Sequence, residues 1–393
     1  MIKNIIGKFL LVLSSMIFAI LIVEMLLRHL DISYPIFYQV DEHIGWDHIP
    51  GVEGWFKDEG QAYITINQDG LRDREHQLPK PSNTLRIAVL GDSFTQAFQV
   101  PMEKSFSAIL ERKLGKCNAL GGKKVEVINF GVSSYGTAQE LLMLRNKVWK
   151  YKPDIVVLAF LTGNDLRNNS RAVENDVPSM RPYFVHNNSG KLLLDNSFLS
   201  TPKYLFSQKD GHIIYPAINN LRVLQLINHQ RILWKQRSNH SDNNGDGELG
   251  LDMMIYKNPD DPVWQKVWKV TEDLLVVMSD EIKEHGAEFL LVTLSNGIQV
   301  HPNQKKRQSF MKKLGINTLF YPDNRIRQFA EKKGIETLTL APAFQNYVDK
   351  NKVYLHGFDN MILGEGHWNE NGHLLAGNMI ENHLCKQIIT SND

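Results

Sequence analysis

A serine with the setting of a nucleophile lies in residues 91–95, Gly-Asp-Ser-Phe-Thr. This stretch follows the apolar run of residues 87–90 and precedes a segment with a helical pattern. A serine at the carboxyl end of a buried strand, where the chain turns into a helix, projects its hydroxyl into the crevice where open α/β sheets bind ligands. Because Gly-Asp-Ser occurs by chance in roughly one chain in twenty of this length, Ser93 needs partners elsewhere in the sequence.

Partners for Ser93 follow the next two predicted strands. Gly131 comes directly after Asn129-Phe130, and Asn164 lies in Gly163-Asn164-Asp165. Parallel strand ends share one edge of a sheet, so we expect Ser93, Gly131 and Asn164 to converge there. Their main-chain N–H groups, at Ser93 and Gly131, and the Asn164 amide would donate to the oxyanion of acyl transfer. Glycine at position 131 lets a substrate approach the backbone closely, although a plain turn residue is the other interpretation.

A general base for Ser93 is available near the carboxyl terminus. His367 lies in a loop directly before the last predicted helix, and a neutral imidazole takes and returns a proton near neutral pH. We expect His373, inside the start of that helix, to pack or cap. Histidines six residues apart do not share a helix face, so no metal site is expected.

These blocks, in this order, resemble the SGNH hydrolases, also called the GDSL esterase and lipase family. The matching residues are Ser93, Gly131, Asn164 and His367, and the resemblance covers about residues 85–386 without an interruption described below. It implies a flavodoxin-like three-layer α/β/α sandwich, a Ser nucleophile, a His base and a three-part oxyanion hole formed by Ser93, Gly131 and Asn164. Together with the apolar N-terminus, residues 67–73 and 366–369 are similar to bacterial membrane-anchored members.

The chain departs from the family pattern at the acid that orients the histidine. The last block of the family reads Asp-x-x-His, whereas Gly364 stands three residues before His367. We expect Glu365 to substitute; the alternatives are Asp359 from the preceding loop, or a Ser-His dyad held by a main-chain carbonyl. Two other acids, Asp92 and Asp165, are expected to hold their own loops through backbone hydrogen bonds.

The elements that must position these residues follow an alternation of strands and helices from residue 85 onward, which is typical of a parallel α/β sheet. Predicted strands are 86–90, 125–129, 155–160, 289–293 and 336–340, giving a five-stranded parallel sheet. Predicted helices are 105–114, 138–150, 263–285, 324–333 and 371–386.

Three regions make up the expected domain organisation. Residues 1–30 form an N-terminal membrane anchor, residues 31–84 a small extended subdomain or collar, and residues 85–393 the SGNH hydrolase domain. Residues 167–262 interrupt the alternation with Asn-, Ser- and Gly-rich sequence, which indicates an insertion over one rim of the sheet. Within it, residues 242–247 resemble half of a calcium loop, but Met253 replaces the bidentate Glu, so a flexible polar loop is preferred.

The N-terminal region predicts one transmembrane helix. Residues 9–23 are uncharged, and residues 25–27 extend the apolar pattern past Glu24. The resulting nineteen or so helical residues span roughly 28 Å, close to the hydrocarbon core of a bilayer. Lys3 and Lys8 on the amino side place that end in the cytoplasm and the catalytic domain in the periplasm or outside the cell. Small residues expected at a cleavage site are absent, so an uncleaved anchor is favoured over a signal peptide or a buried helix.

Composition narrows the partners and cofactors. The formal net charge is +1, which offers no field for nucleic acid, and no glycine-rich nucleotide loop exists, so no cofactor is expected. Cys117 and Cys385 end the first and last core helices; an extracytoplasmic compartment would allow a disulfide, and a cytosolic one would leave two thiols. Trp368 is expected to pack in the core, with a sugar-stacking platform as the alternative.

Three functions are compatible with these residues. The first is a serine esterase that removes small acyl groups, such as acetyl, from a cell-envelope or exported glycan. The second is an O-acyltransferase that passes the acyl group from the same site to a sugar hydroxyl. The third is a non-catalytic membrane-tethered binding or assembly protein. The expected partners are therefore an acylated carbohydrate or other ester substrate and the membrane, and the acyl chain stays open.

Overall fold

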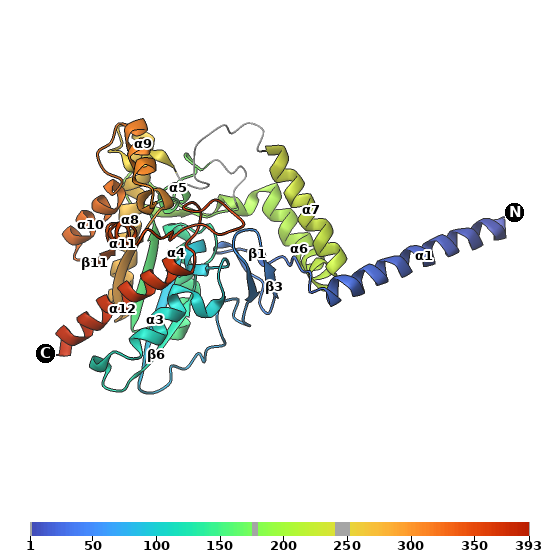
Figure 1. Ribbon diagram of the computed structural model, residues 1–393, viewed down its shortest axis with the longest axis horizontal. Helices are drawn as coiled ribbons and strands as arrows, with labels where there is room; N and C mark the ends of the chain where they lie inside the picture. Colours follow the sequence, from blue (N-terminus) through green and yellow to red (C-terminus); the bar gives the residue numbers. More distant parts are fainter. Residues whose placement is uncertain (1, 175–179, 240–251, 393) are drawn as a thin grey trace.

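A five-stranded parallel sheet forms the centre of this computed structural model, which describes residues 2–174, 180–239 and 252–392 (Figure 1). The strands stand in the order β6-β5-β7-β10-β11. This is the 2-1-3-4-5 order of flavodoxin-like folds, so the predicted sheet is confirmed. The strand bounds are β5 Thr84–Gly91, β6 Lys124–Asn129, β7 Ile155–Leu161, β10 Glu288–Leu294 and β11 Glu336–Thr339.

Helices cover both faces of the sheet because its strands are apolar on both sides. Every residue of β7 is buried, as expected of a parallel strand with helices above and below it. In β5, Ile87 and Val89 pack toward one layer, whereas Ala88 and Leu90 pack toward the other. The first layer contains α3 Phe106–Leu114, α11 Ala341–Asn351 and α12 Glu370–Asn392; the second contains α4 Thr137–Asn146, α8 Pro262–Glu284 and α10 Tyr321–Lys333.

The five predicted helices are present with small shifts in their ends, and others were not predicted. Besides α11 and the two helices of the rim insertion described below, these are α9 Gln304–Leu314 and two four-residue helices, α2 Ser93–Gln96 and α5 Asp165–Asn168. Helix α9 is missed by an apolar-periodicity criterion because only Arg307 among its residues is buried. Short helices such as α2 are formed by capping and packing rather than by a repeating pattern.

The two cysteines are joined in a disulfide, Cys117 to Cys385, across 268 residues of sequence. Helices α3 and α12 lie side by side, with Gly377 of α12 so close to Ile109 that a Cβ there would lie 2.6 Å from its Cγ2. The structure therefore adopts the bridged alternative.

The N-terminal helix α1, Ile2–His29, projects away from the rest of the molecule (Figure 1). Within Ile5–His29, an 18-residue window has a mean hydropathy of 2.7 and is 11% buried, so the helix is long and apolar enough to cross a membrane. A signal sequence passes the same test of length and composition.

The collar consists of two β-hairpins packed beside the first strand of the sheet. They are β1 Tyr38–Asp41 with β2 Gly45–His48, and β3 Glu53–Phe56 with β4 Ala62–Thr65. Their small apolar core includes Phe37, Ile64 and Ile66 and also Phe98, which belongs to the segment after Ser93. The collar thus shares a core with the segment that carries the candidate nucleophile.

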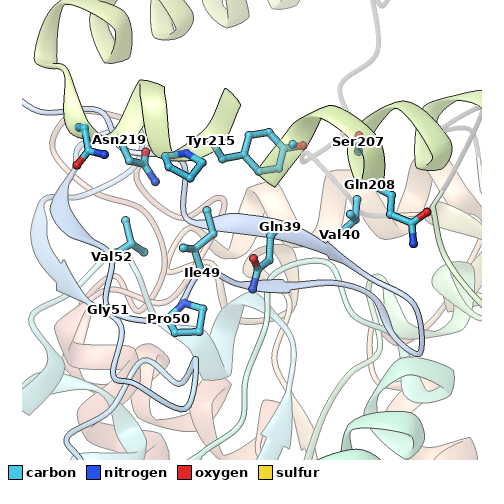
Figure 2. A pocket seen from close by; sticks show the side chains of 13 residues that line it. Gln39, Val40, Ile49, Pro50, Gly51, Val52, Ser207, Gln208, Tyr215 and Asn219 are labelled. Carbon is cyan, nitrogen blue, oxygen red and sulfur yellow. The ribbon is translucent and has the colours of Figure 1, made fainter. Parts of the chain in front are cut away.

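The rim insertion is more regular than its composition indicates. It contains the hairpin β8 Tyr183–His186 with β9 Leu192–Asp195, and two long helices, α6 Pro202–Asn220 and α7 Arg222–Asn239. A cavity of about 530 Å³ lies between α6 and the collar, lined by Gln39, Ile49 and Tyr215 among others (Figure 2). The sequence resembling a calcium loop, residues 242–247, lies outside the described residues.

Candidate active site

Ser93 begins α2 directly after β5, as the sequence predicts. The Asp92 carboxylate caps this helix by accepting from Phe94 N at 2.9 Å, and it also accepts from Asn164 Nδ2 at 2.8 Å. The turn needs glycine at position 91, where φ is +158° and a Cβ would lie 2.2 Å from Thr95 Oγ1. Asp92 therefore has the loop-holding role expected of it, and it ties the Ser93 turn to Asn164.

His367 faces Ser93 across the carboxyl edge of the sheet. Its Nε2 lies 2.8 Å from Ser93 Oγ, within hydrogen-bond distance. The Phe94 ring lies beside the imidazole, with 4.9 Å between the ring centroids. The two residues predicted as nucleophile and base, 274 positions apart, are thus in direct contact.

The acid next to His367 is Glu59, from the loop between β3 and β4 of the collar. One Glu59 oxygen accepts from His367 N at 2.7 Å, and the other is hydrogen-bonded to His367 Nδ1. Burial would raise the pKa of Glu59, but hydrogen bonding to His367 and its charge outweigh burial and hold that pKa below its usual value. An ionised Glu59 keeps the proton on Nδ1, which leaves Nε2 free to accept from Ser93.

The expectation that Glu365 orients His367 is corrected by this geometry. The Glu365 carboxylate pairs with Lys306 Nζ at 2.6 Å, and Asp359 is exposed. The backbone before His367 leaves no room for side chains. At Gly366, with φ +75°, a Cβ would lie 2.2 Å from Glu59 Oε1; at Gly364, with φ +88°, it would lie 2.5 Å from the His301 ring.

The three residues predicted for an oxyanion hole lie at the same sheet edge, but their donors differ. Asn164 Nδ2 has two hydrogens and spends one on Asp92, and Ser93 N–H has no acceptor in the described part of the chain. Gly131 N–H already donates to Asn129 Oδ1 at 2.9 Å. Glycine is needed at 131 because a Cβ would lie 2.4 Å from Gln96 N. The close approach at Gly131 is therefore made by α2.

A second collar residue supports the nucleophile from behind. The buried Arg72 donates to the carbonyl oxygens of Gln96 (2.8 Å), Ala97 and Val100, which follow Ser93 at the carboxyl end of α2. Burial lowers the pKa of Arg72 to about 9, so its guanidinium is still charged at neutral pH. A cation at a helix carboxyl end satisfies the last carbonyl groups.

A buried hydrogen-bonded chain supports the loop of His367. His356 Nδ1–H donates to Gly366 O at 2.7 Å, and its Nε2 lies 3.0 Å from Ser295 Oγ. Trp368 Nε1–H donates to the same Ser295 oxygen at 2.9 Å. Burial lowers the pKa of His356 to about 4, so this ring is neutral near pH 7. Trp368 is fully buried, which confirms the packing role and excludes the sugar platform.

Other predicted residues near the site have structural contacts. His373 is buried, and Phe106 N donates to its Nδ1 at 3.3 Å, so it caps α3. Asp165 accepts from Leu161 N at 3.1 Å and holds the turn after β7. Burial, together with the neighbouring carboxyl groups, raises the pKa of Asp165 and of Glu140 well above their usual values. In the described residues, no three His, Cys, Asp or Glu side chains are arranged to hold a metal ion.

Sequence reasoning missed Glu59, which lies outside the motif blocks, and it gave no role to Arg72, although Arg72 lies within residues 67–73. The available signal was indirect. Gly364 in place of the usual acid indicated that the carboxylate must come from another segment. Glu59 stands between Asp58 and Gly60 in a polar loop, with nothing in its local pattern to link it with a histidine 308 residues later.

Comparisons with known proteins find structures of weak similarity. The acetyl xylan esterase AlAXEase has 13% sequence identity and a TM-score of 0.39, over 76% of this chain and 99% of the other. A protein described as lipolytic and of the G-D-S-L family, from Desulfitobacterium hafniense, has 13% identity and a TM-score of 0.36 over 76% and 98%. A catalytic mutant of an acetylxylan esterase from Geobacillus stearothermophilus has 13% sequence identity and a TM-score of 0.38, over 76% of this chain and 93% of the other.

No family model and no curated protein matches the chain. At these TM-scores the structural similarity carries no weight for function. The structure itself adds two observations to the resemblance in sequence. The sheet has the 2-1-3-4-5 order, and Ser93 contacts His367 at its carboxyl edge.

Proposed function

We propose that the protein is a serine carboxylic ester hydrolase that works through an acyl-enzyme. The observation that carries the proposal is the line of contacts from Ser93 Oγ to His367 Nε2, at 2.8 Å, and from His367 Nδ1 to Glu59. A nucleophile, a base and an acid that orients the base are the requirements for activating a hydroxyl group at neutral pH.

In this mechanism His367 Nε2 takes the proton of Ser93 as Oγ attacks the ester carbonyl carbon. The imidazolium, stabilised by Glu59, then returns that proton to the leaving alcohol, and the C–O bond breaks to leave an acyl group on Ser93. Water enters, gives a proton to His367, and attacks the acyl carbon. The carboxylic acid leaves, and Ser93 recovers its proton.

The negative charge of each tetrahedral intermediate would be stabilised by N–H donors at the carboxyl edge of the sheet. Ser93 N–H and the second hydrogen of Asn164 Nδ2 support this part of the proposal. Loss of one such donor typically costs about 2.7–4 kcal/mol of transition-state stabilisation. Asn164→Ala should therefore lower kcat strongly while leaving covalent labelling of Ser93 detectable.

We infer that α1 anchors the protein and that the hydrolase domain lies outside the cytoplasm. The length and apolar composition of α1 support the anchor. The Cys117–Cys385 disulfide supports an oxidising compartment, where such bonds persist. Titration of the denatured, unreduced protein should find no free thiol, and two reactive thiols would count against this location. An acylated cell-envelope or exported glycan, with acetyl as the acyl group, is the substrate that this location favours.

The function is tested with nitrophenyl esters of increasing acyl length and a fluorophosphonate probe on the full chain. We expect turnover, and labelling that mass spectrometry maps to Ser93; Ser93→Ala should lose both. A folded protein that is neither labelled nor active would overturn the proposal. Partition of the acyl group between water and added saccharide then separates a hydrolase from an acyltransferase.

A further inference from the structure

The helical hairpin of α6 and α7, within the rim insertion, is attached to the carboxyl-terminal end of α1. The Glu24 carboxylate accepts from Arg222 N at 3.1 Å and Val223 N at 3.0 Å, which satisfies the amino end of α7. Arg28 Nη2 donates to Asn220 O at 2.6 Å, at the carboxyl end of α6. The direction of α1 relative to the hairpin is therefore set by hydrogen bonds at both helix ends.

The chain directly after α1 holds the same hairpin. Tyr34 N donates to Gln225 Oε1 at 2.8 Å, and the Tyr34 ring stacks on His229 with 4.0 Å between centroids. Ile36 exchanges two hydrogen bonds with the Asn219 side chain, at 2.7 and 2.9 Å. One side of the hairpin is thus packed against the segment that directly follows α1.

The hairpin runs across the direction of α1 (Figure 1). Glu24, where the two meet, is the first acidic residue after the apolar run, so it marks the level at which a spanning helix leaves the hydrocarbon. If α1 crosses the bilayer, α6 and α7 lie along its surface.

The opposite side of the hairpin exposes large apolar side chains. Phe206 and Ile213 of α6 are 62% and 65% exposed, and Ile227 and Trp234 of α7 are 59% and 74% exposed. Each pair is seven residues apart, which is two helical turns, so each helix carries a stripe on one face. Exposed stripes of this size on two adjacent helices indicate an interaction surface.

The charges of the hairpin indicate the partner. Among its described side chains only one, Asp210, is acidic. The basic ones are Lys203, Lys209, Arg222 and Arg231. Helices that combine Lys and Arg with exposed Trp, Phe and Ile lie in the interface of bilayers that contain anionic lipids.

We propose that the α6–α7 hairpin is a second membrane contact that lies on the bilayer surface beside α1. Its apolar stripes enter the zone between headgroups and acyl chains, and its basic side chains meet anionic phosphates. This inference rests on the anchoring proposed above. Two contacts prevent the domain from tilting freely about α1, so the distance of Ser93 from the membrane is held within a narrow range.

The test uses the full chain in lipid nanodiscs, with a fluorophore on Ile213→Cys and the Cys117–Cys385 bridge left oxidised. The matched control is Tyr347→Cys, at a position that is 42% exposed. It belongs to α11, a helix on the side of the molecule away from α1 (Figure 1). With nitroxide lipids labelled near the headgroup, we expect fluorescence at position 213 to fall by about two-fold or more and that at 347 to stay constant. Discs containing phosphatidylglycerol should give more quenching than discs of phosphatidylcholine alone.

Charge reversal supplies a second variant that does not touch the fold. Lys209→Glu with Arg231→Glu alters two exposed side chains. We expect these changes to reduce the quenching in anionic discs and to remove its dependence on lipid charge. Quenching that keeps its dependence on lipid charge in this variant would count against the headgroup contacts.

The outcomes separate the hairpin from the anchor. A chain that is retained in discs, but whose position 213 is as open to iodide as position 347 and is not quenched by lipid, overturns the hairpin contact and leaves the anchor in place. Failure of the chain to enter discs overturns the anchor and the hairpin contact together. A third outcome is that position 213 is shielded from iodide but is not quenched by lipid, and that this shielding increases with two chains per disc. This result would show that the exposed face of the hairpin binds a second copy, and it would overturn the inference.

Discussion

The collar and the rim insertion are both additions to the same sheet and they touch each other, yet they contact different functional parts of the molecule. The collar places Glu59 on His367 and Arg72 on the carbonyl groups behind Ser93. Helix α7 of the insertion is instead hydrogen-bonded to Glu24 near the carboxyl end of α1, and α6 and α7 expose apolar side chains to solvent. The collar, which precedes the first strand of the sheet, thus contributes to the candidate active site. The rim insertion, which lies within the sheet domain, instead contributes to the attachment of that domain to α1.

The two regions also differ in the kind of contact that they make. Collar contacts involve buried charges, and a buried charge that loses its partner costs several kcal/mol. Outward contacts of the hairpin are exposed, and substitutions at such positions usually change stability by less than about 0.5 kcal/mol. Changes in the collar should therefore impair chemistry or folding, and changes on the hairpin should do neither.

The largest expected effect is on kcat after removal of the collar carboxylate. Glu59→Gln keeps the shape of the side chain but no longer favours the Nδ1–H tautomer of His367. Loss of the orienting acid in a serine triad lowers kcat by about 10⁴-fold. Steady-state hydrolysis of a nitrophenyl ester measures this drop.

The matched control is the acid predicted from sequence. Glu365→Gln removes a carboxylate that pairs with Lys306, so kcat should stay within about two-fold of wild type. If the two variants lose activity equally, the collar has no special part in the chemistry and the contrast between the regions fails.

Acid should weaken both the collar and the loop that it contacts. His48, in β2 of the collar, and His356, beside the His367 loop, are buried, and burial lowers their pKa values to about 3 and about 4. Unfolding returns each ring to its ordinary pKa near 6.5, so the unfolded chain binds more protons between about pH 6 and pH 4. The free energy of unfolding should therefore decrease as the pH is lowered through this range, by up to about 1.4 kcal/mol per pH unit for each histidine.

Denaturant unfolding at several pH values measures this slope. In His356→Asn the slope should decrease by the contribution of one proton, although the variant is less stable throughout. A slope that is unchanged in this variant would mean that His356 is protonated in the folded protein.

Removal of the Arg72 guanidinium should lower the free energy of unfolding by less than low pH does. Arg72→Met leaves three carbonyl groups at the end of α2 without their donor, and we expect a loss of about 3 kcal/mol of unfolding free energy with a lower kcat. The control is Arg74→Met, whose half-exposed side chain pairs with Glu111. It should lose no more than about 0.5 kcal/mol. Equal losses in the two variants would refute the role given to Arg72.

The smallest expected effect comes from the hairpin. Ile213→Asp combined with Ile227→Asp changes two exposed side chains that do not contact the site, so kcat on a soluble ester should stay within about two-fold of wild type. A large loss of kcat in detergent solution would show that the hairpin takes part in the chemistry, as the collar does.

Much of the fold could be predicted because parallel strands are buried on both faces and leave continuous apolar runs. Strands β7 and β10 are such runs, whereas the edge strand β11 is only partly buried and is indicated mainly by the alternation of strands and helices. Ser93 and Asn164 could be predicted because strand ends in a parallel sheet meet at one edge. His367 could be predicted from the last block of the family resemblance. Geometry that depends on strand order alone is accessible from a sequence.

Contacts between distant segments are the part that could not be predicted. The carboxylate of Glu59 reaches His367 through the packing of a separate hairpin, and the N–H of Gly131 turns toward Asn129 through a local side-chain bond. Helices α6 and α7 were missed because their outward faces are also apolar, which weakens the periodicity that identifies an amphipathic helix.

Gly364 limits the segments from which an acid can reach His367. Restoring an aspartate three residues before His367 takes a substitution at a position with φ +88°, where any Cβ would collide with the His301 ring. A single substitution at position 364 therefore cannot supply an acid to His367, because the loop and His301 must change together. Any redesign of the His367 loop has to include the collar.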